Sequence, residues 1–286
     1  MKNAYLIMAH RQNRQLERLL AALDGPDSQI FLHMDAKCGD FDPDTLRRHV
    51  TAGILHFTPE RLDVRWGGYS QIRCELLMLK TALGTPGWEY AHLLSAQDLP
   101  ILPQAERDAV LSAHPGAEWI NFQPELTDRD RKKAAYWYFF QEKNVNRQWA
   151  PGWRALSFLS MQAQKLWPLR RNRKITFYKG SNWFSITREL ASYVISREDW
   201  IQKTFRFSVC CDELFLQTLV MDSPFRTRLR PEGNLRFIDW EHTDTSGPCV
   251  LTMKDLPRIQ ASGCLFARKF DEAVDPEVMD CFSNPI

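Results

Sequence analysis

Short apolar runs alternate with helix-patterned stretches over the first 122 residues, and this alternation constrains the fold more than any other feature. The apolar runs are residues 4–10, 29–35, 54–58, 88–95 and 119–122. The stretches between them that carry apolar residues at helical spacing are residues 13–23, 42–50, 69–83 and 103–113. Short continuous apolar runs are typical of buried parallel strands. The pattern therefore predicts an α/β fold, with a mostly parallel, Rossmann-like central sheet flanked by helices.

Polar residues stand where three of these predicted strands end. His10 and Arg11 follow the first strand, Asp35 ends the second, and Asp98 closely follows the fourth. Ligands of such sheets bind beyond the carboxyl ends of the strands, so the pattern fits a nucleotide-sugar cleft. Polar residues also begin at the ends of ordinary strands. Neither G-x-G-x-x-G nor a P-loop pattern is present, which removes the usual support for a dinucleotide or P-loop site.

Composition excludes several classes of protein. A net charge of +2 over 286 residues argues against a dedicated nucleic-acid binder, which is usually far more basic. The 7 cysteines show neither a C-x-x-C pair nor zinc-ligand spacing, so we expect reduced thiols and a cytoplasmic protein. Apolar runs of 18 residues are absent, and no transmembrane helix is expected. The 10 Trp and 7 Tyr residues permit a site in which an aromatic ring stacks on a sugar.

Residues 208–219, S-V-C-C-D-E-L-F-L-Q-T-L, predict an apolar helix with Asp212 and Glu213 in its first turn. Carboxylates at that position interact favourably with the helix dipole, and a cap is their more common role. The same pair could instead direct a base into a cleft. Both interpretations stay open on this segment alone.

The middle of the chain, residues 127–179, is basic and less regular. Its two clusters of basic residues flank an amphipathic stretch, residues 149–167, that is rich in bulky apolar side chains. Such a stretch can lie on an anionic membrane surface, and we expect peripheral membrane contact through residues 153–179 as one interpretation. A surface helix beside a solvated charge run is the other.

Nine blocks, in order, resemble one known family. They are A-Y-L-I-M-A-H from Ala4, F-L-H-M-D from Phe31, R-W-G-G-Y-S from Arg65, H-L-L-S-A-Q-D-L-P-I from His92, G-S-N-W-F from Gly180, D-E-L-F-L-Q-T-L from Asp212, L-R-F-I-D-W from Leu235, and L-T-M-K-D-L-P with L-F-A-R-K-F-D near the end. Together they resemble glycosyltransferase family 14, the core-2/I-branching β-1,6-N-acetylglucosaminyltransferases and peptide O-xylosyltransferases. Each block is weak alone, but the ordered set spans nearly the whole chain.

The resemblance implies one GT-A-type glycosyltransferase domain over residues 1–286. Residues 1–125 would form the nucleotide-binding half, 126–179 a basic and aromatic insertion, and 180–286 the acceptor and catalytic half. It also implies an inverting transfer from a UDP-sugar, with no cofactor and no divalent metal. Asp128 and Asp130 match D-x-D by letter, but they do not follow a nucleotide-binding strand, and we interpret the match as coincidence.

The family's functional residues can be carried over position by position. Glu213 would be the general base, with Asp212 beside it, because a one-step inversion needs a base to take the acceptor's hydroxyl proton. Basic side chains would neutralise the departing diphosphate in place of a metal. The implied UDP-binding residues are His10, Arg11, Asp35, Trp66, Gly67, Arg268 and Lys269, and the implied sugar- or acceptor-binding residues are Asp98, Ser181, Trp183 and Trp240.

Departures from the animal members narrow this expectation. We expect no N-terminal membrane anchor of the kind found in Golgi enzymes. The cysteines do not support secretory disulfides, and Asn182 stands where the xylosyltransferases resemble G-S-D-W-F with Asp. We therefore expect a bacterial, cytoplasmic enzyme acting on a glycan or lipid-linked acceptor in polysaccharide synthesis, with N-acetylglucosamine as the favoured donor sugar. A catalytically silent UDP-sugar or glycan-binding protein of the same fold is the alternative. An unrelated α/β nucleotide-binding regulator is a third.

Overall fold

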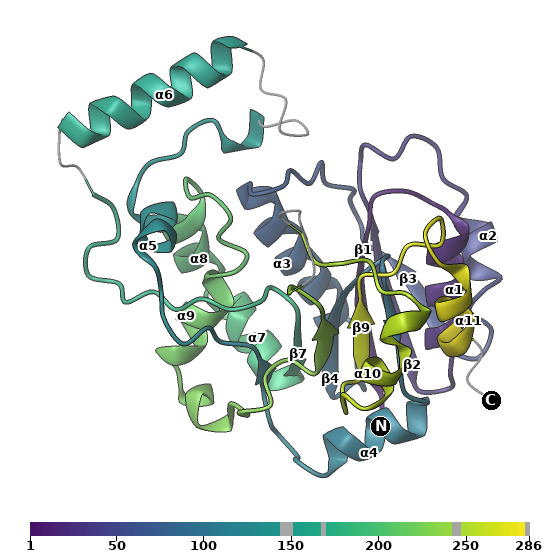
Figure 1. The fold of residues 1–286 in the computed structure, drawn as a ribbon. Helices are drawn as coiled ribbons and strands as arrows, with labels where there is room; N and C mark the ends of the chain where they lie inside the picture. Colours follow the sequence, from purple (N-terminus) through teal and green to yellow (C-terminus); the bar gives the residue numbers. More distant parts are fainter. Residues whose placement is uncertain (144–150, 167–169, 242–246, 284–286) are drawn as a thin grey trace.

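A six-stranded sheet forms the centre of the molecule (Figure 1), and the computed structural model describes residues 1–143, 151–166, 170–241 and 247–283. The strand order is β3-β2-β1-β4-β7-β6. The strands are β1 (Asn3–Ala9), β2 (Ser28–Met34), β3 (Ile54–Phe57), β4 (Tyr90–Ser95), β6 (Trp119–Ile120) and β7 (Phe184–Thr187). The first four run parallel, whereas β7 is antiparallel to both β4 and β6. The predicted α/β fold with a mostly parallel sheet is confirmed.

Helices cover both faces of this sheet because its inner strands are apolar on both sides. Along β1, Ala4 and Leu6 pack into one buried cluster, whereas Tyr5 and Ile7 pack into the other. The first cluster includes residues of α3 (Tyr69–Leu83), α7 (Arg188–Ser196), α8 (Glu198–Phe205) and α9 (Phe215–Met221). The second includes residues of α1 (Arg14–Leu23), α4 (Gln104–Ser112), α10 (Leu256–Gln260) and α11 (Pro276–Ser283). A continuous apolar strand between two helical layers is the arrangement expected of a parallel sheet.

The last third of the chain returns to the end of β4 through a second, three-stranded sheet of order β5-β9-β8. Its strands are β5 (Asp98–Pro100), β8 (Arg236–Ile238) and β9 (Phe266–Arg268). Asp98 lies opposite Arg268 where β5 pairs antiparallel with β9. This pairing brings the basic A-R-K-F-D block to the edge of the main sheet at which β4 ends.

The remaining helices are α2 (Pro43–Arg47), α5 (Asp128–Ala135) and α6 (Pro151–Leu166), with single 3₁₀ turns at η1 (Gln141–Lys143), η2 (Pro224–Arg228) and η3 (Met253–Asp255). The amphipathic helix predicted within residues 149–167 is present as α6; Trp149 and Trp167 lie outside the described residues. Figure 1 shows α6 at the margin of the molecule, beyond α5 and far from the sheet. None of the described helices is both long enough and apolar enough to cross a membrane.

One predicted helix begins later than its sequence indicates. Asp212 and Glu213 lie in a turn before α9, which starts only at Phe215, so the prediction that both acids stand in the first helical turn is wrong. The N-cap of α9 is Leu214, and no side chain caps the helix there. A bend at Ser208–Cys211, with Cys210 at a φ of 48°, delays the helix. The two acids therefore do not cap α9.

Candidate active site

The carboxyl ends of β1, β2 and β4 bring three groups of predicted site residues together. Ala9 pairs with Met34, and Met8 pairs with Ser95, so the residues that follow these strands meet at one edge of the sheet. His10 and Arg11 are exposed after β1, and Asp35 and Asp98 follow the neighbouring strands. The chain leaves β1 toward β2 on one side and reaches β4 on the other. Ligand sites of α/β sheets form at such a switch point.

Asp35 is buried in a network of hydrogen bonds at this edge. Its carboxylate accepts from the backbone N–H groups of Lys37 and Val64, at 2.8 and 3.2 Å. The Lys37 ammonium lies 2.7 Å from Asp35 and 2.8 Å from Asp63. The structure therefore places Asp35 at the predicted nucleotide pocket, where it also holds the loop from Asp63 to Val64 against the end of β2.

The Trp66–Gly67 loop lies against the segment that carries the paired acids. Gly67 has a φ of 73°, which favours glycine, and a Cβ atom there would lie 3.0 Å from Cys210 Sγ. The Cys210 N–H donates to the Gly67 carbonyl at 2.9 Å. Trp66 itself is 60% exposed, so its ring is accessible to a ligand. Two blocks that are about 140 residues apart thus form one wall of the site.

Asp98 and Arg268 form a buried ion pair, with 3.3 Å between Arg268 Nε and Asp98 Oδ1. Asp98 also accepts from the Ser95 N–H at 2.8 Å, and the Arg268 guanidinium stacks 4.0 Å above the ring of Trp183. Burial lowers the pKa of Arg268, and the charge of Asp98 opposes that effect. These three predicted site residues therefore support one another beneath the site.

Lys269 and Trp240 are more accessible. Lys269 is half-buried, and among the described residues no carboxylate pairs with its ammonium. The next residue donates its N–H to the Gln97 carbonyl at 2.9 Å, which places Lys269 beside the end of β4. Trp240 is 57% exposed just after β8.

Glu213 lies in a cluster of charges that was not predicted. Its carboxylate is 3.5 Å from Lys179 Nζ and 3.8 Å from Lys133 Nζ, and Asp130 joins the same two lysines at 3.1 and 2.8 Å. Burial alone would lower the pKa of Lys133, but the hydrogen bond to Asp130 and the charge of Glu213 raise it. Glu213 is 37% exposed, so it can reach a bound molecule. The arrangement suits a carboxylate that accepts a proton from that molecule.

The same cluster accounts for the D-x-D letters at residues 128–130. The carboxylate of Asp130 is engaged by two lysines and by the Thr127 hydroxyl, which donates at 2.7 Å. Burial would raise the pKa of Asp130, but these donors outweigh it and hold that pKa well below its usual range. Both lysines belong to the basic clusters within residues 127–179, and no site role was predicted for them. The helical spacing of Asp130 and Lys133 on α5 was the available signal.

Gly180 fixes Glu213 from the other side. Its N–H donates to the Glu213 carbonyl at 3.0 Å, and a Cβ atom at Gly180 would lie 1.7 Å from the Asn121 carbonyl oxygen. Gln217 of α9 donates to the Ser181 carbonyl at 2.7 Å. The G-S-N-W-F block is thus hydrogen-bonded to the segment from Glu213 to Gln217, which places Ser181 beside that segment.

A second carboxyl group lies buried behind Asp212. Gln71 donates to Asp212 at 3.1 Å and accepts from the Gly67 N–H, which links Asp212 to the Trp66–Gly67 loop. Glu75, one helical turn along α3, is fully buried, and neither of its oxygens has a hydrogen-bond partner among the described residues.

Burial, with the charge of Glu213, raises the pKa of Asp212 to about 7. Burial and the charge of Asp212 raise the pKa of Glu75 well above its usual value. Of the adjacent acids, only Glu213 reaches the surface.

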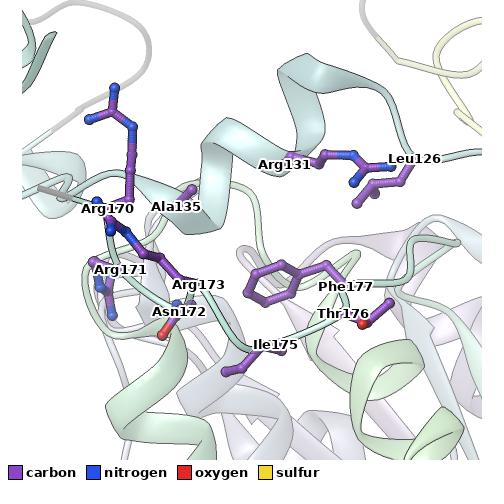
Figure 2. A pocket seen from close by; sticks show the side chains of 10 residues that line it. All are labelled: Leu126, Arg131, Ala135, Arg170, Arg171, Asn172, Arg173, Ile175, Thr176 and Phe177. Carbon is purple, nitrogen blue, oxygen red and sulfur yellow. The ribbon is translucent and has the colours of Figure 1, made fainter. Parts of the chain in front are cut away.

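A cavity of about 280 Å³ adjoins this cluster (Figure 2). Its lining comes from α5 and residues 170–177: Leu126, Arg131, Ala135, Arg170, Arg171, Asn172, Arg173, Ile175, Thr176 and Phe177. Figure 2 shows Phe177 and Ile175 across from α5, with arginines on both sides. Helix α5 also carries Lys133, and the chain reaches Lys179 two residues after Phe177, so both segments that line the cavity lead to the lysines that pair with Glu213.

Comparisons with known proteins assign the chain to a family. The model of the family described as Core-2/I-Branching enzyme matches residues 3–260. Xylosyltransferase 2 of Rattus norvegicus is 28% identical over 97% of the chain, and xylosyltransferase sqv-6 of Caenorhabditis elegans is 26% identical over 93%. These alignments cover 33% and 34% of those proteins, so the chain spans about a third of the length of the curated relatives it matches. The crystal structure of mouse xyloside xylosyltransferase 1 in its apo form aligns with a TM-score of 0.39 and 12% identity, over 93% of this chain and 97% of that one. The family match extends over most of the described sheet and includes Glu213, and the chain belongs to the Core-2/I-branching enzyme family.

Proposed function

We propose that the protein is an inverting glycosyltransferase that moves a sugar from a UDP-sugar to an acceptor hydroxyl, with Glu213 as general base. The observation that carries the proposal is the partly exposed carboxylate of Glu213, which pairs with Lys133 and Lys179 beside the predicted nucleotide edge. The family supports sugar transfer of this kind.

In the proposed reaction, Glu213 accepts the proton of the acceptor hydroxyl while the oxygen attacks the anomeric carbon. The new glycosidic bond forms as the bond to the diphosphate breaks, and UDP leaves with that electron pair. Lys269 stabilises the growing charge on the diphosphate, as a fixed cation does best in a partly dry site. Trp66 and Asp35 hold the nucleotide, Ser181 borders the donor sugar, and Trp240 stacks on the acceptor. No divalent metal takes part in the proposed step.

N-acetylglucosamine is our favoured donor sugar, and xylose is the competitor that the names of the relatives support. Asn182, in place of the Asp of the xylosyltransferase motif, favours the former. The test is UDP release from a panel of UDP-sugars, with EDTA and with manganese. Turnover that survives EDTA would support the proposal and identify the sugar, whereas turnover only with manganese would contradict the metal-free step. UDP binding without turnover of any donor would favour the silent binding protein.

We further propose that the acceptor is carried on a lipid and that the enzyme works at the cytoplasmic face of a membrane. All seven cysteines are unpaired, as expected of a reducing compartment. The test compares a lipid-linked acceptor in vesicles with the matching water-soluble glycan. Turnover of the lipid-linked acceptor at a lower enzyme concentration would support this assignment. Equal turnover of both acceptors would contradict it.

A further inference from the structure

Helix α6 is amphipathic in the reverse sense to an ordinary surface helix. Gln164 faces the body of the protein, where its side chain donates to the Trp137 carbonyl at 2.9 Å and accepts from the Trp137 N–H at 2.8 Å. Ser157 and Ser160 share this inner side, at spacings of seven and four residues from Gln164, and both are half-buried. Two apolar residues of α6 also meet the protein, because Met161 is half-buried and Trp153 packs on Phe140 with 5.5 Å between ring centroids. The inner side of α6 is therefore mostly, but not wholly, polar.

The outer side of α6 is apolar. Leu156 is 47% exposed, Phe158 62%, Leu159 61% and Leu166 86%. Leu159 and Leu166 are seven residues apart and so point the same way, with Leu156 one turn before Leu159. We call these four side chains the α6 apolar face. Exposed large apolar side chains elsewhere in the described chain are scattered, and a contiguous group of this kind marks an interaction surface.

The charge around this face has one sign. No Asp or Glu stands between Glu142 and Glu189 in the sequence, although Lys and Arg recur throughout that stretch. Arg154 and Lys165 lie on α6 itself, and Arg170, which lines the arginine-rich cavity of Figure 2, donates to the Gln164 carbonyl at 2.7 Å. An apolar helix face on a stretch of chain that carries Lys and Arg but no Asp or Glu complements an anionic lipid surface.

Arg171 is not part of this surface, although the sequence places it in the same basic run. Its guanidinium donates to the carbonyls of Lys203 and Thr204 at 3.1 and 3.0 Å and stacks 4.6 Å above the Trp137 ring. Arg171 therefore holds the segment after α6 onto the body. A charge reversal at Arg171 would test folding, so it cannot test docking.

We propose that the α6 apolar face docks on an anionic lipid bilayer. The apolar side chains enter the boundary between headgroups and acyl chains, while Arg154 and Lys165 lie at headgroup level. The purpose of docking rests on the proposed function. Arg170 contacts the end of α6, where it donates to the Gln164 carbonyl, and residues 170–179 end at Lys179, which pairs with Glu213. Docking would thus hold Glu213 near acceptors carried in the membrane.

The test is co-sedimentation of the full chain with vesicles of phosphatidylcholine containing 30% phosphatidylglycerol, as about a third of anionic lipid gives a strongly charged surface. We expect the double variant Leu156→Ser with Leu159→Ser to weaken vesicle binding at least about tenfold, because it removes two apolar anchors. The matched control, Ile54→Ser with Val274→Ser, changes two exposed apolar residues elsewhere and should bind like wild type. Far-UV circular dichroism checks that α6 remains folded in both variants.

Vesicle binding by the α6 variant at the wild-type level would overturn the proposal, as would absence of wild-type binding. If the wild type is a dimer in solution and the α6 variant is a monomer, the α6 apolar face binds a second copy of the chain, and the proposal is overturned as well. Turnover of a water-soluble acceptor, measured in parallel, should be the same in wild type and in the α6 variant. Because vesicle binding is measured without any sugar donor, failure of the proposed enzymatic function would leave the docking result readable.

Discussion

Arg268 pairs with Asp98 across the junction of β5 and β9, and the pair is buried beneath the site. The resemblance assigned these residues separately, one to the diphosphate and the other to the sugar. Their mutual contact, and the stacking of Arg268 on Trp183, gives them a shared structural role. Lys269 has no such partner among the residues that the structure describes, and it is then the basic side chain that we expect to reach the donor.

We predict that Arg268→Met and Lys269→Met have different effects. Removing Arg268 leaves Asp98 as an uncompensated buried charge and should destabilise the fold by about 3 kcal/mol. Lys269→Met should leave stability within about 0.5 kcal/mol, because a partly exposed side chain without an ion pair contributes little, yet it should weaken UDP binding. Chemical denaturation and calorimetric titration with UDP measure the two quantities. Equal loss of stability in both variants would contradict this division.

Lys179 should affect turnover through the position of Glu213. We expect Lys179→Met to lower kcat about tenfold, because Glu213 loses its nearer ion-pair partner and with it part of its orientation. Lys80→Met is the matched control, since Lys80 forms an exposed ion pair with Glu198 at 2.6 Å, remote from the acids. Steady-state kinetics with saturating donor compare the three proteins. If Lys80→Met lowers kcat as much as Lys179→Met does, the result would contradict an orienting role for Lys179.

Glu75 should make stability depend on pH. Because its pKa is raised in the folded state, its contribution to stability is fully present below the unfolded pKa of about 4.3 and is lost as pH rises toward the folded value. Glu75→Gln cannot ionise, so we expect its Tm at pH 8 to exceed that of wild type by about 3 °C. The difference should shrink at pH 4.5. A Tm difference that does not change with pH would show that ionisation of Glu75 does not limit stability.

Gly180 should tolerate no side chain. We expect Gly180→Ala to destabilise the protein by about 2 kcal/mol, because the added methyl group would overlap the Asn121 carbonyl. Turnover should fall as well, since the shift would move the N–H that holds the Glu213 carbonyl. Gly39→Ala is the control, with nothing within 4 Å of the added atom. Denaturation curves of the two variants that coincide would contradict the close packing at Gly180.

The fold could be predicted because local pattern and tertiary packing agree in the first half of the chain. The apolar run at 4–10 and the periodic helix at 69–83 bury the residues that their patterns indicate. The start of α9 was misplaced because the pattern in 208–219 shows apolar spacing only. The bend at Cys210 arises from its contact with Gly67, far away in the sequence. Contacts between residues so far apart in the sequence do not change the local spacing of apolar residues.

The site shows the same division. The resemblance singles out Glu213 and Asp35, whereas nothing in the sequence distinguishes Lys133 and Lys179 from the other basic residues of the stretch 127–179. Their partner Asp130 was seen only as part of a coincidental letter match. What distinguishes these lysines is the approach of α5 and residues 170–179 to the turn before α9, which only the assembled fold shows. The reverse orientation of α6 likewise follows from its contact with Trp137.

The most direct test of the account is the turnover of Glu213→Gln beside wild type, with the preferred UDP-sugar and acceptor in EDTA. Removing a general base should lower kcat by about a thousandfold, while UDP affinity and Tm stay near wild-type values. That result would establish Glu213 as the base that accepts the acceptor's proton. Turnover by Glu213→Gln within about threefold of wild type would contradict the account, since a base that acts in the transition state cannot be removed without a large loss.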